Sequence, residues 1–65
     1  MQMQINGRAR DVTASDVAGL LLELGLDASR VAIELNLAII VQADFAKTPL
    51  SAGDSIEIVQ FVGGG

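Results

Sequence analysis

Residues 15–25, SDVAGLLLELG, contain the one segment of this chain with a clear helical pattern of apolar residues. These residues recur at i, i+3, i+4 and i+7 and form a single stripe along a predicted helix: Val17, Leu20, Leu21 and Leu24. Ser15 is predicted to cap the start of the helix, with Thr13 as the alternative, and Gly25 to end it in the left-handed conformation. Gly19 costs such a helix about 1 kcal/mol relative to alanine, which close packing of its backbone against a sheet would explain.

Short segments with alternating apolar residues flank this helix, and such alternation predicts half-buried strands. Before the helix, residues 1–5 and 8–12 are separated by Asn6-Gly7, the strongest short signal for a tight hairpin. After it, strands are predicted at residues 30–35, 38–41 and 55–62, with a bend near Asn36-Leu37. Residues 43–50 are predicted to form an irregular crossover, in which Phe45 and Leu50 reach the core and Pro49 excludes a central strand.

The predicted order is two strands, a helix, two strands, an irregular crossover and a last strand. A lone helix must bury its apolar stripe on a sheet, and the first hairpin and the last strand can lie side by side over it. This order favours an α+β fold of the β-grasp, ubiquitin-like type, with a mixed four- to five-stranded sheet and the later strands at its edges. Other α+β rolls stay open. Residues 1–62 are predicted to form a single domain, followed by a flexible glycine tail at residues 63–65.

The composition restricts the chemistry of the chain. It has 65 residues, of which 51% are hydrophobic and 3% aromatic, and it contains neither cysteine nor histidine. Disulfides and the commonest zinc ligands are therefore excluded, and so are thiol catalysis and serine–histidine pairs. We expect no metal site, no bound cofactor and no enzymatic activity of the conventional kind.

Charge and hydropathy argue against nucleic-acid and membrane binding. The formal net charge is −4, and the basic residues are scattered along the sequence: Arg8, Arg10, Arg30 and Lys47. Nucleic-acid binding calls for clustered basic residues. The longest apolar stretch, residues 31–43, is too short for a spanning helix and contains Glu34 and Asn36. No signal-peptide pattern is present in the first residues, so a soluble, cytoplasmic protein is expected.

The chain closes with FVGGG, residues 61–65. Terminal glycines are hard to order and often simply fray, but the preceding sequence favours a working arm. Residues 44–65, DFAKTPLSAGDSIEIVQFVGGG, together with VAIELN at residues 31–36, resemble the ThiS-type sulfur carrier proteins of thiamine biosynthesis. Those proteins are ubiquitin-like β-grasp proteins of this length, with a Gly-Asp turn before the last strand and a terminal Gly-Gly.

The resemblance implies a co-substrate whose C-terminal carboxylate, that of Gly65, is the working group. An E1-like adenylyltransferase of the ThiF type would adenylate it with ATP and Mg, and a persulfide enzyme would supply sulfur to give a thiocarboxylate. A thiazole synthase of the ThiG type would then take the sulfur. Gly64 and Gly63 would form the tail that reaches the partner's active site, and Phe61 and Val62 would be candidates for partner docking.

Two features depart from the family pattern, and two other functions stay open. The family commonly has Asn-Gly at the second hairpin and a proline-basic segment after the fourth strand, whereas this chain has Asn36-Leu37 and Gln42-Ala43. A small sulfur-donating subunit of molybdopterin synthase shares the fold and tail but is usually longer. A ubiquitin-like protein modifier, or a plain β-grasp interaction module, is the third possibility.

Overall fold

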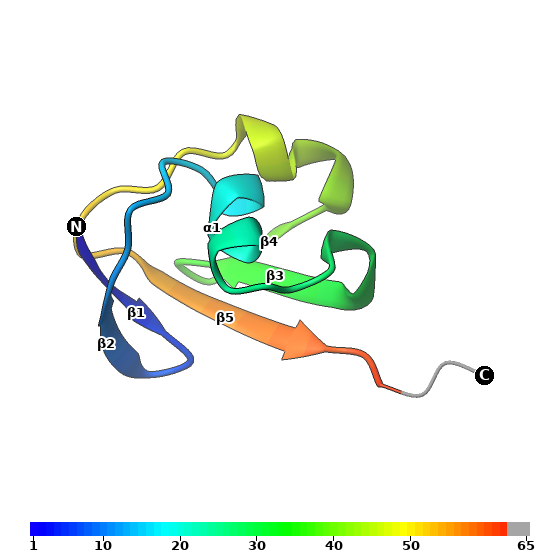
Figure 1. Cartoon of the computed structure of the whole chain (residues 1–65), viewed down its shortest axis with the longest axis horizontal. Coiled ribbons are helices and arrows are strands. Elements are labelled where there is room, and N and C mark those ends of the chain that lie inside the picture. The colour runs from blue at the N-terminus through cyan, green and yellow to red at the C-terminus, as the bar shows by residue number, and fades with distance from the viewer. Residues whose placement is uncertain (63–65) are drawn as a thin grey trace.

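The computed structural model describes residues 1–62, which form a five-stranded mixed sheet with α1 packed on one face (Figure 1). In chain order the elements are β1 (Gln2–Ile5), β2 (Arg8–Asp11), α1 (Val17–Glu23), η1 (Ala28–Arg30), β3 (Val31–Leu35), β4 (Ala38–Ile40), η2 (Gln42–Lys47) and β5 (Ser55–Gln60). The strand order is β2-β1-β5-β3-β4. Strands β1 and β5 are parallel, and the other neighbouring pairs are antiparallel.

This topology is the predicted β-grasp arrangement, with the first hairpin beside the last strand. One detail of the prediction is wrong. The later strands are not both at the edges, because β3 lies inside the sheet between β5 and β4. Five residue pairs join β3 to β5, from Val31 opposite Gln60 to Leu35 opposite Ile56. Strand β5 is therefore paired on both sides, and it leads directly to the C-terminal segment.

Both hairpins turn through two residues with positive φ. Asn6 and Gly7 join β1 to β2 with φ values of 52° and 81°, the geometry of a type I′ turn. Asn36 and Leu37 join β3 to β4 with φ values of 50° and 71°. The second hairpin therefore keeps the tight turn even though leucine replaces the usual glycine. Leucine is strained in this region of backbone conformation.

Helix α1 begins one residue later than predicted. Its N-cap is Asp16, not Ser15, because the Asp16 backbone is extended and its Oδ1 accepts a hydrogen bond from the Gly19 N–H at 2.7 Å. The Ser15 carbonyl instead accepts from the Leu50 N–H at 2.9 Å, which ties the loop to the crossover. The helix ends as predicted. Gly25 has a φ of 72°, and the Leu26 N–H donates to the Leu21 carbonyl at 2.8 Å, as in a Schellman motif.

The explanation offered for Gly19 is also wrong. A Cβ at this position would lie 3.2 Å from Asp16 Oδ1 and 3.4 Å from the Ala14 Cβ. No atom of the sheet lies within 4 Å of that position. Gly19 therefore leaves room for the capping carboxylate and the preceding loop rather than for the sheet.

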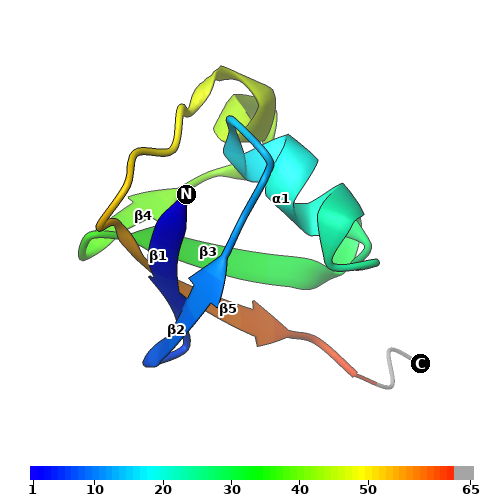
Figure 2. The ribbon, with the colours of Figure 1, turned by 60° about the vertical axis from the view of Figure 1, so that its left-hand side comes forward.

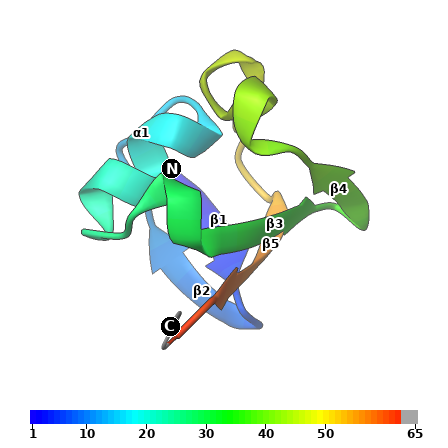
Figure 3. The ribbon, with the colours of Figure 1, turned by 90° about the vertical axis from the view of Figure 1, so that its right-hand side faces the viewer.

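The core lies between the sheet and the helices. Helix α1 crosses above one face of the sheet (Figure 2), and η2 lies on the same side (Figure 3). The buried apolar residues form one cluster: Met3, Val12, Val17, Leu20, Leu21, Val31, Ile33, Leu35, Phe45, Leu50, Ile56 and Ile58. Three residues of the predicted helix stripe belong to this cluster, Leu24 packs against it partly buried, and Phe45 and Leu50 reach the core from the crossover as expected.

Candidate functional site: the C-terminal arm

The candidate site begins where β5 leaves the sheet. Phe61 and Val62 continue the chain past Gln60, beyond the last rung of the sheet (Figure 1). Phe61 is 58% exposed and Val62 is 93% exposed, so neither predicted docking residue belongs to the core. The predicted tail residues Gly63, Gly64 and Gly65 lie outside the described residues. The structure thus shows the base of the arm and how it is held.

The start of β5 is held by the turn between β3 and β4. Asn36 Oδ1 accepts from the Ser55 N–H at 2.9 Å, and the Asn36 N–H donates to the Ser55 carbonyl at 2.7 Å. Asn36 Nδ2 also donates to Asp54 Oδ1 at 3.0 Å. The other carboxylate oxygen of Asp54 accepts from the Ser51 N–H at 2.7 Å. One carboxylate therefore closes the turn at residues 51–54 and fixes it against the second hairpin.

The middle of β5 is held by the turn between β1 and β2. Asn6 Oδ1 accepts from the Ile58 N–H at 2.7 Å, and Asn6 Nδ2 donates to the Ile58 carbonyl at 3.2 Å. The Asn6 N–H also donates to the Ile56 carbonyl at 2.9 Å. The regular parallel pairing of β1 with β5 reaches only Ile5 opposite Ile56. The carboxamide of Asn6 thus extends the pairing by one rung after the backbone of β1 has turned away.

The end of β5 is held by η1. The Phe61 N–H donates to the Arg30 carbonyl at 2.8 Å. Residue Asp27 caps η1, because its Oδ1 accepts from both the Ser29 hydroxyl and the Ser29 N–H. Those two hydrogen bonds, the hydroxyl one first, lower the pKa of Asp27, and the Arg30 guanidinium lowers it further. The hydrogen bond of Phe61 therefore depends on a short capped helix just before β3.

Neither a metal-binding cluster nor a membrane-spanning helix occurs among the described residues. Within residues 1–62 no three acidic side chains come together in a way that could hold a metal ion. No helix in that part of the chain is long and apolar enough for a membrane span, and α1 has only seven residues. What the site presents is a rigid strand, fixed at Ser55, Ile58 and Phe61, that leads into the C-terminal glycines.

Sequence reasoning missed the side-chain roles of Asn6 and Asn36. Both were recognised only as turn residues, and their partners on β5 lie 52 and 19 residues away in the chain. The available signal was that both turns begin with asparagine. Its carboxamide both donates and accepts and can therefore replace a missing backbone rung.

The comparison with known proteins decides the family. The ThiS family model matches residues 3–65, which is nearly the whole chain and includes its last residue. The chain belongs to the ThiS family. Within that family, the β-grasp fold described above is shared with a crystal structure of a thiamine biosynthesis protein, ThiS, from Geobacter metallireducens. That chain is 32% identical, has a TM-score of 0.84, and each chain covers 100% of the other.

Three further similar proteins are informative. A solution structure of a thiamine biosynthesis protein from the same organism has a TM-score of 0.81, with 32% identity over 100% of this chain and 88% of that one. Among curated proteins, a thiazole synthase from Paramagnetospirillum magneticum is 46% identical and one from Magnetococcus marinus is 35% identical, each over 100% of this chain. This ThiS-family chain spans only 20% of the length of either thiazole synthase.

Proposed function

We propose that this protein is a sulfur carrier of thiamine biosynthesis and that the carboxylate of Gly65 is the group that carries the sulfur. The observation that carries the proposal is the ThiS-family match, which extends to Gly65 itself. The anchoring of β5 supports it, because three sets of hydrogen bonds fix the strand that leads to the tail. A fixed base reduces the entropy that must be lost when the tail is placed in a partner's active site.

The chemistry follows from the properties of a terminal carboxylate. Its pKa is about 3.5, so it is ionised at neutral pH and is a poor electrophile. Attack on the α-phosphate of ATP would form an acyl adenylate and release pyrophosphate. A persulfide would then attack the acyl carbon and expel AMP, and reduction of the resulting acyl disulfide by a thiol would leave the thiocarboxylate.

All other parts of this chemistry are assigned to partner proteins. An E1-like adenylyltransferase would bind ATP and Mg, a persulfide-forming enzyme would supply sulfur, and a thiazole synthase would accept it. The two curated relatives support the last assignment. In each of them a segment similar to this chain makes up a fifth of a polypeptide that is named thiazole synthase. This likeness favours the thiazole pathway over the molybdopterin alternative and over a protein modifier.

The proposal is tested by intact-mass spectrometry of the protein isolated from cells that contain its native enzymes. We expect a fraction of the chains to have one oxygen exchanged for sulfur, and we expect alkylation by iodoacetamide at the C-terminus. Because the chain contains no cysteine, any alkylated thiol-like group is informative. Unmodified protein after co-expression with the adenylyltransferase and the sulfur donor would contradict the proposal, and a lysine conjugate would favour a protein modifier.

A further inference from the structure

The outer face of the sheet, which is the face turned away from α1, carries a hollow of about 180 Å³. Its lining comes from β3, β4 and β5: Ala32, Ile33, Glu34, Ile39, Glu57 and Val59. We call this feature the outer hollow. Ala32 lies opposite Val59 in the β3–β5 pair and has the smallest side chain of the set. Ile39 and Val59 are 79% and 58% exposed. The small side chain of Ala32 therefore forms the bottom of the hollow, and solvent-exposed apolar residues lie beside it.

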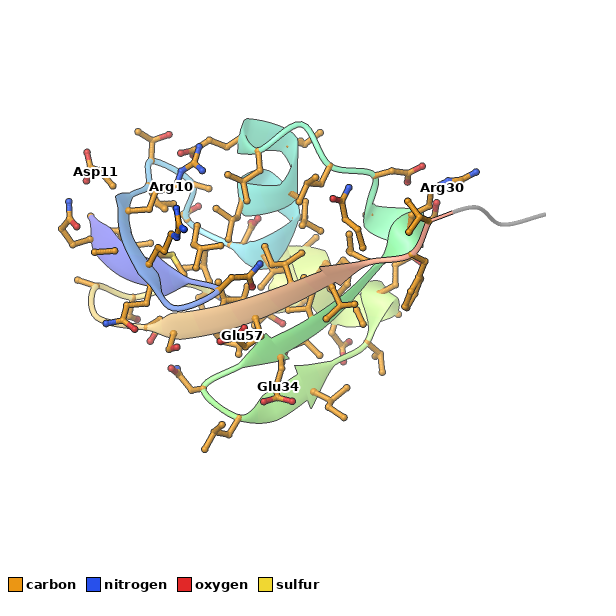
Figure 4. The ribbon with its side chains drawn as sticks, turned by 90° about the horizontal axis from the view of Figure 1, so that it is seen from below. Arg10, Asp11, Arg30, Glu34 and Glu57 are labelled. Carbon is orange, nitrogen blue, oxygen red and sulfur yellow. The ribbon has the colours of Figure 1, made fainter. Side chains whose placement is uncertain are left out.

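Two carboxylates close one side of the outer hollow. Glu34 and Glu57 are direct cross-strand partners on β3 and β5, and they lie on neighbouring strands when the outer face is viewed (Figure 4). On the other side of β3, Glu34 is the cross-strand partner of Ile39 on β4. Like charges directly opposite each other destabilise a sheet. The protein therefore keeps an unfavourable pair at the edge of an exposed apolar hollow.

No cation of the described chain compensates this pair. The ion pairs within residues 1–62 join the N-terminal amine to Asp11 and Arg30 to Asp27, and neither involves the two glutamates. Arg10 lines a different hollow, which it shares with Leu24 and Leu26 on the helix side of the sheet. Figure 4 shows Arg10 over the first hairpin and Arg30 at the far end of β5, both away from the two carboxylates. The outer hollow is therefore apolar along its length and negatively charged at one side.

We propose that the outer hollow receives an arginine side chain from a partner protein. The aliphatic stem of arginine lies on apolar surface while its charged end stays polar, which matches Ile39 and Val59. Its planar guanidinium has five N–H donors, enough to bond Glu34 and Glu57 together. The volume is below the range of about 300–1,000 Å³ that is usual for small-molecule pockets, and it suits a single side chain. The partner's surface around this arginine is apolar, because exposed apolar residues flank the hollow.

This inference deepens the proposed function, since it names the surface by which the carrier would dock while Gly65 reacts. Its first test does not depend on that function. We would titrate the ¹⁵N-labelled protein with n-butylguanidinium and, in parallel, with n-butylurea, which has the same stem without the charge. The expected result is saturable shifts of the Ala32, Glu34, Glu57 and Val59 amides with butylguanidinium only.

Two double variants are matched in charge. Glu34→Gln/Glu57→Gln removes two negative charges at the outer hollow, and Asp11→Asn/Asp44→Asn removes two negative charges elsewhere. The first variant should lose the butylguanidinium shifts and the second should keep them. Ala32→Leu should also lose them, because it fills the floor without changing any charge. Melting temperatures near that of the parent establish that each variant is folded. Equal responses to the two compounds, or shifts that persist in the glutamine variant, would overturn the inference.

The second test uses the adenylyltransferase and the thiazole synthase from the same organism as two separate arms of a calorimetric titration. Removal of the two charges should weaken binding to at least one enzyme by about tenfold or more, and the Asp11→Asn/Asp44→Asn variant should bind as the parent does. Unchanged binding in both arms would overturn the inference while leaving thiocarboxylate formation intact. Dimerisation of the free protein through this face, detected by sedimentation and abolished by Glu34→Gln/Glu57→Gln, would overturn it too, because the occupant would be a second copy.

Discussion

The side chain of Asn6 pairs with the backbone of Ile58 as another strand would, accepting its N–H at 2.7 Å and donating to its carbonyl at 3.2 Å. The two residues are 52 positions apart, so this contact joins the first hairpin to the last strand. It lies at the point where β1 has turned into the hairpin and β5 has lost its parallel neighbour. The turn residue thus carries the sheet one step closer to the C-terminal arm.

Asn6→Gly should test the value of this pairing. Glycine adopts the positive φ of the turn without strain, so the substitution removes the two hydrogen bonds but leaves the hairpin. At about 0.5–1.5 kcal/mol for each hydrogen bond, we expect a loss of about 1–3 kcal/mol in the free energy of unfolding, measured with urea. Exchange of the Ile58 amide hydrogen should accelerate more than that of Ile33, and equal acceleration at both would contradict a local role.

Leu21→Ala should be strongly destabilising, because Leu21 is 1% exposed and belongs to the core. Truncation of a buried leucine costs about 2–5 kcal/mol, which is a large fraction of the stability of a small domain. The matched control is Leu22→Ala, one residue along the same helix, where the leucine is 81% exposed. Its effect on the free energy of unfolding should stay within about 0.5 kcal/mol. Similar melting temperatures for the two variants would contradict the assignment of Leu21 to the buried face of the helix.

These contrasts show which parts of the fold the sequence could predict. The stripe of α1 and the Asn6-Gly7 turn depend on residues close together in the chain, and both predictions are confirmed. The N-cap was misplaced by one residue because Ser15 and Asp16 are equally good caps. In the structure the Ser15 carbonyl accepts a hydrogen bond from the N–H of Leu50, which is 35 positions away in the chain, and the helix is capped by Asp16 instead. The pairing of Asn6 with Ile58 was missed for the same reason, since no local pattern names a distant partner.

The family could be predicted from the end of the sequence, whereas the hydrogen bonds that hold β5 could not. FVGGG and the preceding residues pointed to the family, whereas the hydrogen bonds of Asn6, Asn36 and Arg30 to β5 needed the strand order. The cross-strand neighbours Glu34 and Glu57 are 23 positions apart and become a pair only through the register of β3 with β5.

Leu37→Gly should stabilise the protein. Leu37 has a φ of 71° and its side chain is 90% exposed, so it adds strain and buries little. The left-handed conformation costs a residue with a Cβ about 1–2 kcal/mol, and the extra chain entropy of glycine offsets about 0.5–1 kcal/mol of that gain. We expect a net increase of about 0.5–1 kcal/mol in the free energy of unfolding. Leu37→Ala retains the Cβ and should give no such increase, so an equal gain in both variants would rule out relief of backbone strain.

The stability of the loop before α1 should depend on pH through Glu23. Its carboxylate accepts hydrogen bonds from the Thr13 hydroxyl and from the Thr13 and Ala14 N–H groups. These bonds, led by that of the Thr13 hydroxyl, lower the pKa of Glu23 below its ordinary value of 4.5. The contribution to stability is therefore fully present above the unfolded-state pKa and is lost as the pH falls through the lower folded-state pKa.

Glu23→Gln should lower the melting temperature at neutral pH, and the difference from the parent should shrink as the pH is taken below 4.5. Thr13→Val, which removes only the hydroxyl, should give a smaller effect with the same pH dependence. Melting curves recorded between neutral and acidic pH provide the comparison. A difference in melting temperature that stays constant across this range would show that the charge of Glu23 contributes nothing to the stability of this loop.

Gly64→Val should impair activation of the carrier without affecting the core. A glycine next to the reacting group has no Cβ, whereas valine adds a branched side chain where the partner's channel is expected to be narrow. We expect pyrophosphate release by the adenylyltransferase to fall at least about tenfold, since small misplacements of reacting groups have large effects on rate. Melting temperature is the control, and an unimpaired rate would contradict a narrow channel.

Deletion of Gly65 is the sharpest test of the proposed sulfur carrier. The deletion leaves a terminal carboxylate, now that of Gly64, and so preserves the chemistry while shortening the reach by about 3.5 Å. Misplacement of a reacting group by only about 1 Å can lower a rate by a hundredfold. We therefore expect normal melting and binding through the outer hollow, with pyrophosphate release and thiocarboxylate formation lowered at least about tenfold. Activation equal to that of the parent would mean that the position of the last carboxylate is unimportant, and the assignment of Gly65 as the working group would fall.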